Sequence, residues 1–298
     1  MAISVEKILD HVRVPPGKKV RLKDHDPSWA GDLSTPLKDR KERAAEILAE
    51  GTAAMAEAQD LLYASDTHSI LVILQAMDAA GKDGIIKHVM SGVNPQGCQV
   101  QAFKQPTYEE LDHNFLWRCM KVLPQRGHIG IFNRSYYEEV LVVKVHPELV
   151  QQERIPGAKV NRQFWSDRYE DINTFERHLT RNGTAIVKFF LHVSKEEQRE
   201  RFLARINDPK KHWKFSPADV AEREYWDKYM EAFEDMLGAT STKWAPWHVI
   251  PADYKWVSRA MVAYILATTI ERLDLHYPEV SPAKRKQIEE ARKKLEKG

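Results

Sequence analysis

The stretch Ser69-Ile-Leu-Val-Ile-Leu-Gln-Ala-Met-Asp-Ala-Ala-Gly-Lys-Asp-Gly84 decides the fold of this chain. Residues 69–75 form a short apolar run rich in branched side chains, which is typical of a strand buried on both faces of a parallel sheet. A glycine-containing loop follows, and a helical pattern begins directly after it. This order of strand, loop and helix is the context in which G-x-x-x-x-G-K-S/T binds phosphate groups through backbone N–H groups and a lysine. The stretch therefore predicts a phosphate loop, with an ordinary turn and a solvated lysine as the alternative.

Two positions of this loop depart from that pattern. Ala76 replaces the first glycine, and Asp83 replaces the serine or threonine whose hydroxyl normally contacts magnesium. The metal must then be bound by another group, and the carboxylate of Asp78 in the same loop is the candidate, because Mg²⁺ prefers oxygen ligands. We expect Asp78 to bind Mg²⁺, with Mn²⁺ as an alternative metal. The residues expected to bind phosphate are Ala79, Ala80, Gly81, Lys82, Asp83 and Gly84.

Another apolar run, 129–132, ends in Asn133-Arg134. An apolar strand that leads to an acid is the arrangement in which P-loop enzymes orient metal and water, but here an amide replaces the acid. The metal therefore depends on Asp78, with Glu138 as an auxiliary carboxylate. Arg134 emerges at the same edge, where a guanidinium can stabilise charge on a transferring phosphoryl group. A salt bridge to a neighbouring helix is the alternative role for Arg134.

The segment 195–217 carries a local excess of positive charge. Residues 195–214 include seven basic and four acidic side chains, in a chain whose 45 Lys+Arg and 43 Asp+Glu nearly balance. The helical pattern breaks at Asn207-Asp-Pro209 and restarts at Ser216-Pro217, which predicts a hinged lid that closes on a polyanion and excludes water. A solvated face with ion pairs is the alternative. The basic residues of the lid are Arg199, Arg201, Arg205, Lys210, Lys211 and Lys214.

Apolar runs alternate with helical patterns along the chain, which predicts an α/β fold with a parallel sheet covered by helices. In such sheets ligands bind beyond the carboxyl ends of the strands. We expect a single domain over 1–298, with an extended arm at 1–35 and an exposed final helix at 281–298. The predicted strands are 69–75, 100–103, 128–132, 185–191 and 248–251, and the predicted helices are 36–63, 82–90, 108–122, 164–179, 195–206 and 257–275.

Composition argues against several classes of protein. The formal net charge is only +2, which argues against a protein held to DNA or anionic lipid by bulk charge alone. No apolar stretch approaches the roughly 18 residues that a membrane span needs, and the N-terminus shows no continuous apolar region of a secretory signal. Two cysteines, Cys98 and Cys119, cannot make a four-ligand zinc site. We therefore expect a cytoplasmic protein with no nucleic-acid and no membrane partner.

Six motifs occur in order along the chain: Gln75-Ala-Met-Asp-Ala-Ala-Gly-Lys-Asp-Gly84, Phe103-Lys104-Gln-Pro-Thr107, Phe115-Leu-Trp-Arg118, Asn133-Arg-Ser135 with Glu138, Asp208-Pro-Lys-Lys-His-Trp-Lys214 and Ala245-Pro-Trp-His-Val-Ile-Pro-Ala252. Together they resemble the polyphosphate kinase 2 family. The resemblance implies a three-layer α/β/α P-loop kinase fold, similar to thymidylate kinase, with a helical lid and helical terminal extensions. It also implies magnesium-dependent transfer of phosphoryl groups between inorganic polyphosphate and nucleotides.

The resemblance further implies a role for each matching residue. Asp78, Lys82 and Arg134 are the expected catalytic residues. Asn133 stands where many members of the family carry aspartate, and in this the sequence resembles the subgroup that phosphorylates AMP as well as ADP. Adenine nucleotides are the expected substrates, with guanine nucleotides as an alternative, and we expect a homo-oligomer. The expected nucleotide-binding residues are Lys104, Arg118, Asn133, Arg134 and Glu138, and the lid residues expected to bind polyphosphate are Lys210, Lys211 and Lys214.

Two other functions fit parts of the sequence. An ATP-dependent nucleoside monophosphate kinase of similar fold would be expected to keep the first glycine and the Ser/Thr of the loop, and both are missing here. A non-catalytic polyphosphate-binding module needs only the basic surface, and it leaves Asp78 and Arg134 unexplained.

Overall fold

The computed structural model describes residues 11–297 and is built on one five-stranded sheet. The strand order is β2-β3-β1-β4-β5, and every neighbouring pair is parallel, so the parallel sheet predicted from the sequence is confirmed. The strands are β1 Ser69–Ala76, β2 Cys98–Ala102, β3 Ile129–Asn133, β4 Thr184–His192 and β5 Trp247–Pro251. Strand β1 lies at the centre, and its apolar residues from Ile70 to Leu74 are buried because helices cover both faces of the sheet.

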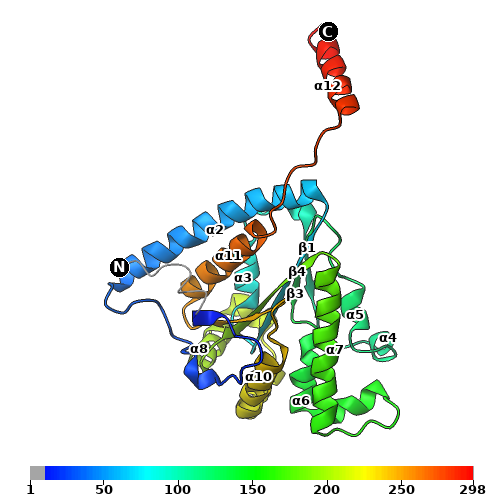
Figure 1. Cartoon of the computed structure of the whole chain (residues 1–298). Coiled ribbons are helices and arrows are strands. Elements are labelled where there is room, and N and C mark those ends of the chain that lie inside the picture. The colour runs from blue at the N-terminus through cyan, green and yellow to red at the C-terminus, as the bar shows by residue number, and fades with distance from the viewer. Residues whose placement is uncertain (1–10, 298) are drawn as a thin grey trace.

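Helices form a layer on each side of this sheet (Figure 1). One layer contains α3 (Lys82–Val89) and α11 (Lys255–Glu271), with α2 (Leu37–Ser65) packed along α11. Gly51 of α2 permits this close packing, since a Cβ there would lie 3.1 Å from the backbone carbon of Ala263. The other layer contains α7 (Arg162–Arg181) and α10 (Trp226–Thr240). The three layers and the strand order are those of an α/β P-loop kinase fold.

Short elements connect the layers, and one of them differs from the prediction. The predicted helix 108–122 is wrong as a single element: it is split into α4 (Tyr108–Leu111) and α5 (Trp117–Met120). The break falls in Asp112-His-Asn114, where the side chain of Asn114 accepts a hydrogen bond from the Leu116 N–H and so competes with helical bonding. The remaining short elements are η1 Leu22–Asp24, η2 Pro95–Gly97, η3 Tyr136–Val140, α6 Val142–Val145, η4 Pro147–Glu153, η5 Pro209–Lys214, α9 Pro217–Ala221 and η6 Glu222–Tyr225. Helix α8 (Lys195–Ile206) follows β4.

Helix α10 was not among the predicted elements, although its pattern is visible in the sequence. Its buried residues recur at three- and four-residue spacing, which is the signature of an amphipathic helix. They include Trp226, Tyr229, Phe233, Met236, Leu237 and Thr240. The predicted helices and strands therefore left residues 218–247 unassigned, and this pattern would have filled part of that gap.

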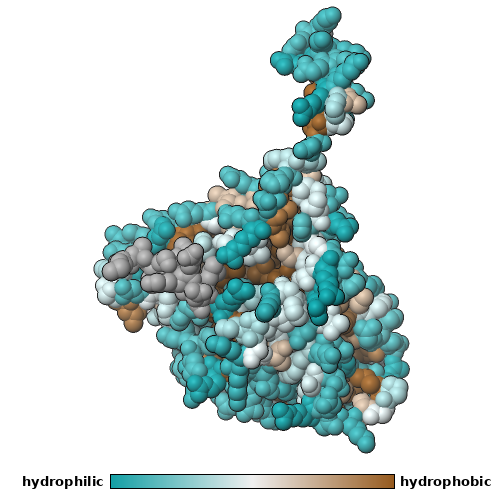
Figure 2. Space-filling view, in the orientation of Figure 1, coloured by the Kyte–Doolittle hydropathy of each residue, from teal (hydrophilic) through white to brown (hydrophobic). Residues whose placement is uncertain are grey.

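The two ends of the described chain behave differently. The N-terminal arm runs along the edge strand β5: the Val14 N–H donates to the Trp247 carbonyl at 2.9 Å, and Val12 and Val14 are buried. The first ten residues of that arm lie outside the described residues. Helix α12 (Pro282–Leu295) instead projects from the body and is exposed along its whole length (Figures 1 and 2). Among residues 11–297, no helix combines the length and the apolar character that a membrane span requires.

Candidate active site

The site lies where β1 and β3 end side by side. Leu74 of β1 is in register with Asn133 of β3, and the Arg134 N–H donates to the Leu74 carbonyl at 3.0 Å. The chain leaves β1 toward β2 on one side of the sheet and leaves β3 toward β4 on the other, so a crevice opens between their carboxyl ends. The loop 77–81 and the residues after Asn133 border this crevice.

The phosphate loop has a backbone that few residues adopt. Ala79 has φ +61° and Gly81 has φ +114°, and both angles lie in the left-handed region. Such a conformation persists in a non-glycine residue only where the surroundings hold it in place. Helix α3 begins immediately after the loop at Lys82, which directs the positive end of the helix toward any phosphate in the crevice.

Helix α8 holds the loop from behind. The Arg201 guanidinium donates through Nη1 to the carbonyls of Ala79 (3.1 Å) and Ala80 (2.7 Å), and through Nη2 to those of Ala252 (2.6 Å) and Asp253 (3.0 Å). Its side chain is only 8% exposed. Arg201 was expected to act as a cation of the lid, but its position is that of a brace that joins the phosphate loop to the end of β5.

Lys82 lies beneath the loop with its ammonium group close to the reacting region. Nζ donates to the carbonyls of Ala76 at 3.0 Å and Met77 at 3.3 Å. Burial, together with the positive charge of Arg134, lowers the pKa of Lys82 from 10.5 to about 8. The ammonium is thus poised to gain from a nearby phosphate, because an anion would restore the charged form that burial disfavours.

Arg134 links the two strand ends. It has φ +65°, and its guanidinium lies 2.5 Å from Asp78 Oδ1 and 3.0 Å from Glu138 Oε2. The charges of Glu138 and Asp78 raise the pKa of Arg134 further, so it is a permanent cation. The structure therefore brings together three of the residues predicted as site residues, Asp78, Arg134 and Glu138.

Asn133 faces the phosphate loop. Its Nδ2 donates to Asp83 Oδ1 at 3.1 Å, and the other carboxylate oxygen of Asp83 accepts from Lys214 Nζ at 3.0 Å. This bond to Lys214 lowers the pKa of Asp83. Lys214 belongs to η5 of the predicted lid, so the Lys214–Asp83 ion pair latches the lid onto the start of α3. The other two lid lysines, Lys210 and Lys211, are exposed, and Lys211 pairs with Asp208 at 2.7 Å.

A cavity of about 540 Å³ opens beside Arg134. It receives four of the predicted site residues besides Arg134: Asp78, Lys104, Arg118 and Glu138. Arg118 is fixed at the wall, since Nη1 donates to the Lys104 carbonyl at 2.8 Å and the guanidinium stacks over the Phe103 ring at 5.3 Å. The cavity is thus cationic near the loop and has room for a molecule of nucleotide size.

Several lining residues of the cavity were not predicted from the sequence. Burial, with the neighbouring Glu153 carboxylate, raises the pKa of Glu139 to about 8. Arg168 Nε lies 3.0 Å from Glu139, and its Nη2 donates to Glu153 at 2.8 Å. On the lid side Asp219 lines the cavity, and burial and the charge of Asp78 raise its pKa. These acids come from three short helical elements, η3, η4 and α9; Glu139 directly follows the predicted Glu138, and no motif marks Glu153 or Asp219.

A phosphate loop with a partly buried lysine, an arginine at the neighbouring strand end and a cavity beside them define a P-loop phosphotransferase. Comparison with known proteins narrows this class. The family model described as polyphosphate kinase 2 matches residues 38–278. The chain belongs to the polyphosphate kinase 2 family, and it is therefore an enzyme that transfers phosphoryl groups.

Individual relatives agree with this family over nearly the whole chain. An ADP-polyphosphate phosphotransferase of Rhodopseudomonas palustris is 52% identical over 95% of this chain and 96% of its own. An AMP/ADP-polyphosphate phosphotransferase of Meiothermus ruber is 44% identical over 92% of this chain and 97% of its own. The crystal structure of polyphosphate kinase 2 from Arthrobacter aurescens TC1 superposes with a TM-score of 0.82 at 41% identity, covering 94% of this chain and 95% of that one.

Proposed function

We propose that this enzyme transfers phosphoryl groups from inorganic polyphosphate to ADP and to AMP, with Mg²⁺ as the metal. One observation carries the proposal: Asp78 belongs to the phosphate loop, lines the nucleotide-sized cavity and pairs with Arg134 at 2.5 Å. A phosphate held by the loop and a phosphate that enters from the cavity would therefore meet at the same pair of side chains. The two relatives above are named for transfer between polyphosphate and these nucleotides.

The donor side is rich in cations that lie close to one another. Arg259 of α11 borders the first turn of α3, since a Cβ on Gly84 would lie 3.6 Å from its Nη2. Burial, followed by the positive charges of Arg201, Arg259 and Lys211, lowers the pKa of Lys255. Neighbouring cations repel one another, and a polyanion bound to them would relieve that repulsion. We assign this surface, from Lys82 past Arg259 and Lys255, to the polyphosphate chain.

The acceptor side is the cavity. Its lining includes the cations Lys104, Arg118 and Arg134 as well as apolar and acidic side chains. A nucleotide would place its phosphates against the cations and its base and sugar against the apolar side chains. Because the phosphates of AMP and of ADP differ in length, both can be used only if the terminal phosphate of each reaches Arg134.

The reaction these groups support is an in-line displacement. A terminal phosphate oxygen of the acceptor attacks the end phosphorus of polyphosphate, a new P–O bond forms, and the bond to the bridging oxygen breaks with its electron pair leaving on the shortened chain. Lys82 and Arg134 stabilise the charge on the transferring group. The Lys214–Asp83 latch closes the lid over this region and limits the access of water.

The few carboxylates near the loop suit a magnesium ion that is bound partly by substrate and water, and not a metal whose ligands all come from the protein. Among residues 11–297, no group of three or more His, Cys, Asp and Glu side chains is arranged around one metal position. Mg²⁺ usually keeps several waters and is bound by one or two carboxylates and by substrate phosphates. Asp78 would hold the ion, with Glu138 as its neighbour, and the ion would neutralise phosphate charge when bound.

The deciding experiment incubates the purified enzyme with AMP, Mg²⁺ and long-chain polyphosphate, without ATP, and separates the nucleotides by chromatography over time. We expect ADP first and ATP later, with no product when Mg²⁺ is chelated. A Lys82→Met variant should lose activity at least about 10²-fold, because one preorganised contact to the transferring group is removed. Conversion of ADP but not of AMP would remove the AMP proposal and keep the ADP one.

The same assay separates the polyphosphate enzyme from an ATP-dependent nucleoside monophosphate kinase of the same fold. With ATP and AMP but no polyphosphate, such a kinase forms ADP at its full rate. We expect this rate to be far below the rate with polyphosphate. The reverse order of rates would replace polyphosphate by ATP as the donor.

We also propose that the enzyme is a cytoplasmic homo-oligomer. Helix α12 supports association: Ile288 and Leu295 are seven residues apart on one face of a helix that is otherwise mostly charged, and they are 49% and 83% exposed. Light scattering of the full chain and of an Ile288→Glu, Leu295→Glu variant tests whether this face holds copies together. Cell fractionation tests the location.

A further inference from the structure

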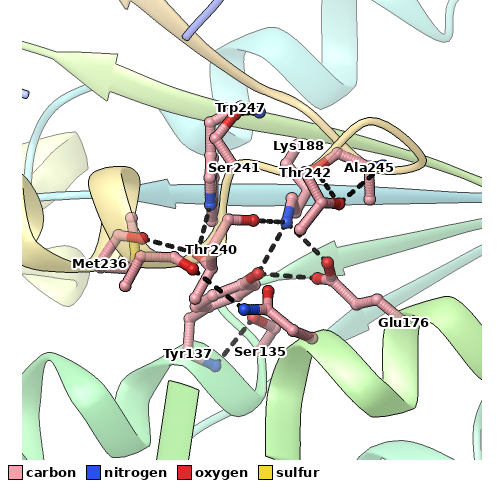
Figure 3. Close-up of polar contacts among 12 residues, drawn as sticks. Ser135, Tyr137, Glu176, Lys188, Met236, Thr240, Ser241, Thr242, Ala245 and Trp247 are labelled. Carbon is pink, nitrogen blue, oxygen red and sulfur yellow. Dashed lines mark hydrogen bonds and ion pairs between the residues drawn. The ribbon is translucent and has the colours of Figure 1, made fainter. Parts of the chain in front are cut away.

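A lysine is completely buried in the middle of β4. Lys188 donates three hydrogen bonds, to Glu176 Oε2 of α7 at 2.6 Å, to the Tyr137 hydroxyl at 2.8 Å and to the Thr240 carbonyl at 2.7 Å (Figure 3). Neither Lys188 nor Glu176 has any exposed surface. An ammonium group has three donors, so every one of them is used. All three donors are therefore satisfied; burial lowers the pKa of Lys188, and the Glu176 carboxylate beside it opposes that shift.

Glu176 ties this lysine to two consecutive tyrosines. Its Oε1 accepts hydrogen bonds from the Tyr136 hydroxyl at 2.9 Å and from the Tyr137 hydroxyl at 2.7 Å. Burial raises the pKa of both tyrosines, so both remain protonated donors. The group formed by Lys188, Glu176, Tyr136 and Tyr137, called here the buried tetrad, joins β4 and α7 to η3.

The tetrad adjoins the residue that reaches the reacting phosphates. Tyr136 is two residues beyond Arg134, and the Ser135 between them is also buried and tied: its hydroxyl accepts from the Tyr137 N–H at 3.2 Å and from Gln75 Nε2 at 3.3 Å. Arg134 itself has φ +65°, which a non-glycine residue adopts at a cost. A strained backbone conformation persists when the residues next to it are held in place. Here Ser135 and Tyr137, which follow Arg134 directly in the chain, are held by the hydrogen bonds just described.

We propose that the buried tetrad is a positioning device for Arg134, which holds its backbone in the left-handed conformation so that the guanidinium faces the phosphate loop. The inference rests on the proposed function only in assigning phosphoryl-transfer work to Arg134. A buried ion pair contributes little net stability compared with apolar side chains of the same size. The positioning role therefore predicts that loss of the tetrad changes the conformation of Arg134, through Tyr137 and Ser135, whereas a merely structural role predicts a change in stability alone.

The test compares Tyr137→Phe with Thr240→Val. Tyr137→Phe removes the hydroxyl that joins Lys188 and Glu176 to the segment after Arg134. Thr240→Val is a matched buried control, because it breaks the bond from Trp247 Nε1 (2.8 Å) and keeps the Thr240 carbonyl that accepts from Lys188. We expect kcat to fall about 10- to 100-fold in Tyr137→Phe, with KM for both substrates within a few-fold of wild type, since small misplacements of a catalytic group act on kcat. Thr240→Val should keep its kcat.

A second measurement links the tetrad to Arg134. The Arg134→Lys change is made in the wild type and in the Tyr137→Phe protein, and the two losses in kcat are compared. A positioning role predicts that Arg134→Lys costs much less in the Tyr137→Phe protein, because the guanidinium is already displaced there. Equal losses in both backgrounds, or a normal kcat in folded Tyr137→Phe, overturn the proposal.

Folding and the identity of the donor are controlled separately. If Tyr137→Phe does not fold, as judged by thermal melting, the Lys188→Met, Glu176→Leu double variant takes its place, since it leaves no lone buried charge. The same fall in kcat is expected, and an unchanged kcat again overturns the proposal. If the wild type uses ATP instead of polyphosphate, the proposed donor is wrong, and the comparison of Tyr137→Phe with Thr240→Val still decides the role of the tetrad.

Discussion

Raising the pH should switch off the charge of Lys82 within the range where the enzyme can be assayed. The pKa of Lys82 is lowered to about 8, first by burial and then by Arg134. The value of kcat/KM for polyphosphate reports the free enzyme, so it should fall along a one-proton limb centred near pH 8, by about tenfold at pH 9. At saturating polyphosphate the limb in kcat should move to higher pH, because phosphate oxygens stabilise the ammonium form.

The lowered pKa of Lys82 also affects the free energy of unfolding. A lysine in a salt bridge stabilises the fold less as the pH rises, whereas Lys82 makes the fold more stable as the pH rises. Between about pH 8 and 10.5 the unfolded chain keeps the Lys82 proton that the folded enzyme has already released, so this residue makes the fold more stable as the pH rises through that window. The difference between 10.5 and 8 corresponds to at most about 3 kcal/mol. The charged lysine opposes folding by up to this amount below pH 8, and Lys82→Met removes the effect.

Two assays check this reasoning. Initial rates with polyphosphate varied at saturating ADP, from pH 7 to 9.5, give the limb in kcat/KM. Urea denaturation of wild type and Lys82→Met at pH 7 and at pH 10 gives the difference in unfolding free energy, which should shift in favour of wild type by about 1–3 kcal/mol at the higher pH. A flat kcat/KM profile, together with a stability difference that does not change with pH, would refute the lowered pKa.

Four further substitutions test other parts of the site. Arg201→Lys removes most of the bonds to four carbonyls and should lower the free energy of unfolding by about 2–4 kcal/mol in urea denaturation, with a loss of kcat; an unchanged midpoint would contradict the brace. Gly81→Ala places a side chain at φ +114° and should cost about 1–3 kcal/mol by the same measurement, and retention of full stability would argue against the loop conformation. Asp83→Asn frees Lys214, so KM for polyphosphate should fall and the plot of log kcat/KM against log salt should steepen by about one unit, whereas Lys214→Met should make it shallower. Equal salt slopes in both variants would remove Lys214 from polyphosphate binding.

The sheet and the phosphate loop were predictable because each rests on local sequence. Strand β1 is a branched apolar run, which is typical of a strand covered on both faces. The meeting of Asp78, Arg134 and Glu138 also followed from the sequence, since the carboxyl ends of parallel strands lie at one edge. The order of the strands did not follow, because it depends on the connections and not on any single segment.

Charge alone did not show which way a side chain points. Arg201 and Arg199 lie on the same helix, yet Arg201 is 8% exposed and Arg199 is 65% exposed. The direction could have been inferred from helical spacing, since Gln198 and Phe202 are buried beside Arg201 and Arg199 lies on another face. The expectation that Asn133 binds the nucleotide stays a prediction; in the structure its amide donates to Asp83. That bond joins residues 50 positions apart, and no sequence pattern marks it.

The buried tetrad was predictable in part: the sequence shows that a buried charge needs a partner, and helical spacing indicates which acid it is. The run Ala185-Ile-Val-Lys-Phe-Phe-Leu191 has the composition of a doubly covered strand with one lysine inside it, so it requires an acid from a covering helix. Helix α7 offers several acids, but Glu176 is the one that shares a face with the buried Ile172 and Leu179, at spacings of four and three residues. A charge on the apolar stripe of a helix and a charge inside an apolar strand are each costly to bury alone. When the two charges are opposite and in contact, each offsets the cost of burying the other. A buried charge in each of two neighbouring elements therefore predicts a contact between them, and in this enzyme that contact adjoins the segment that follows Arg134.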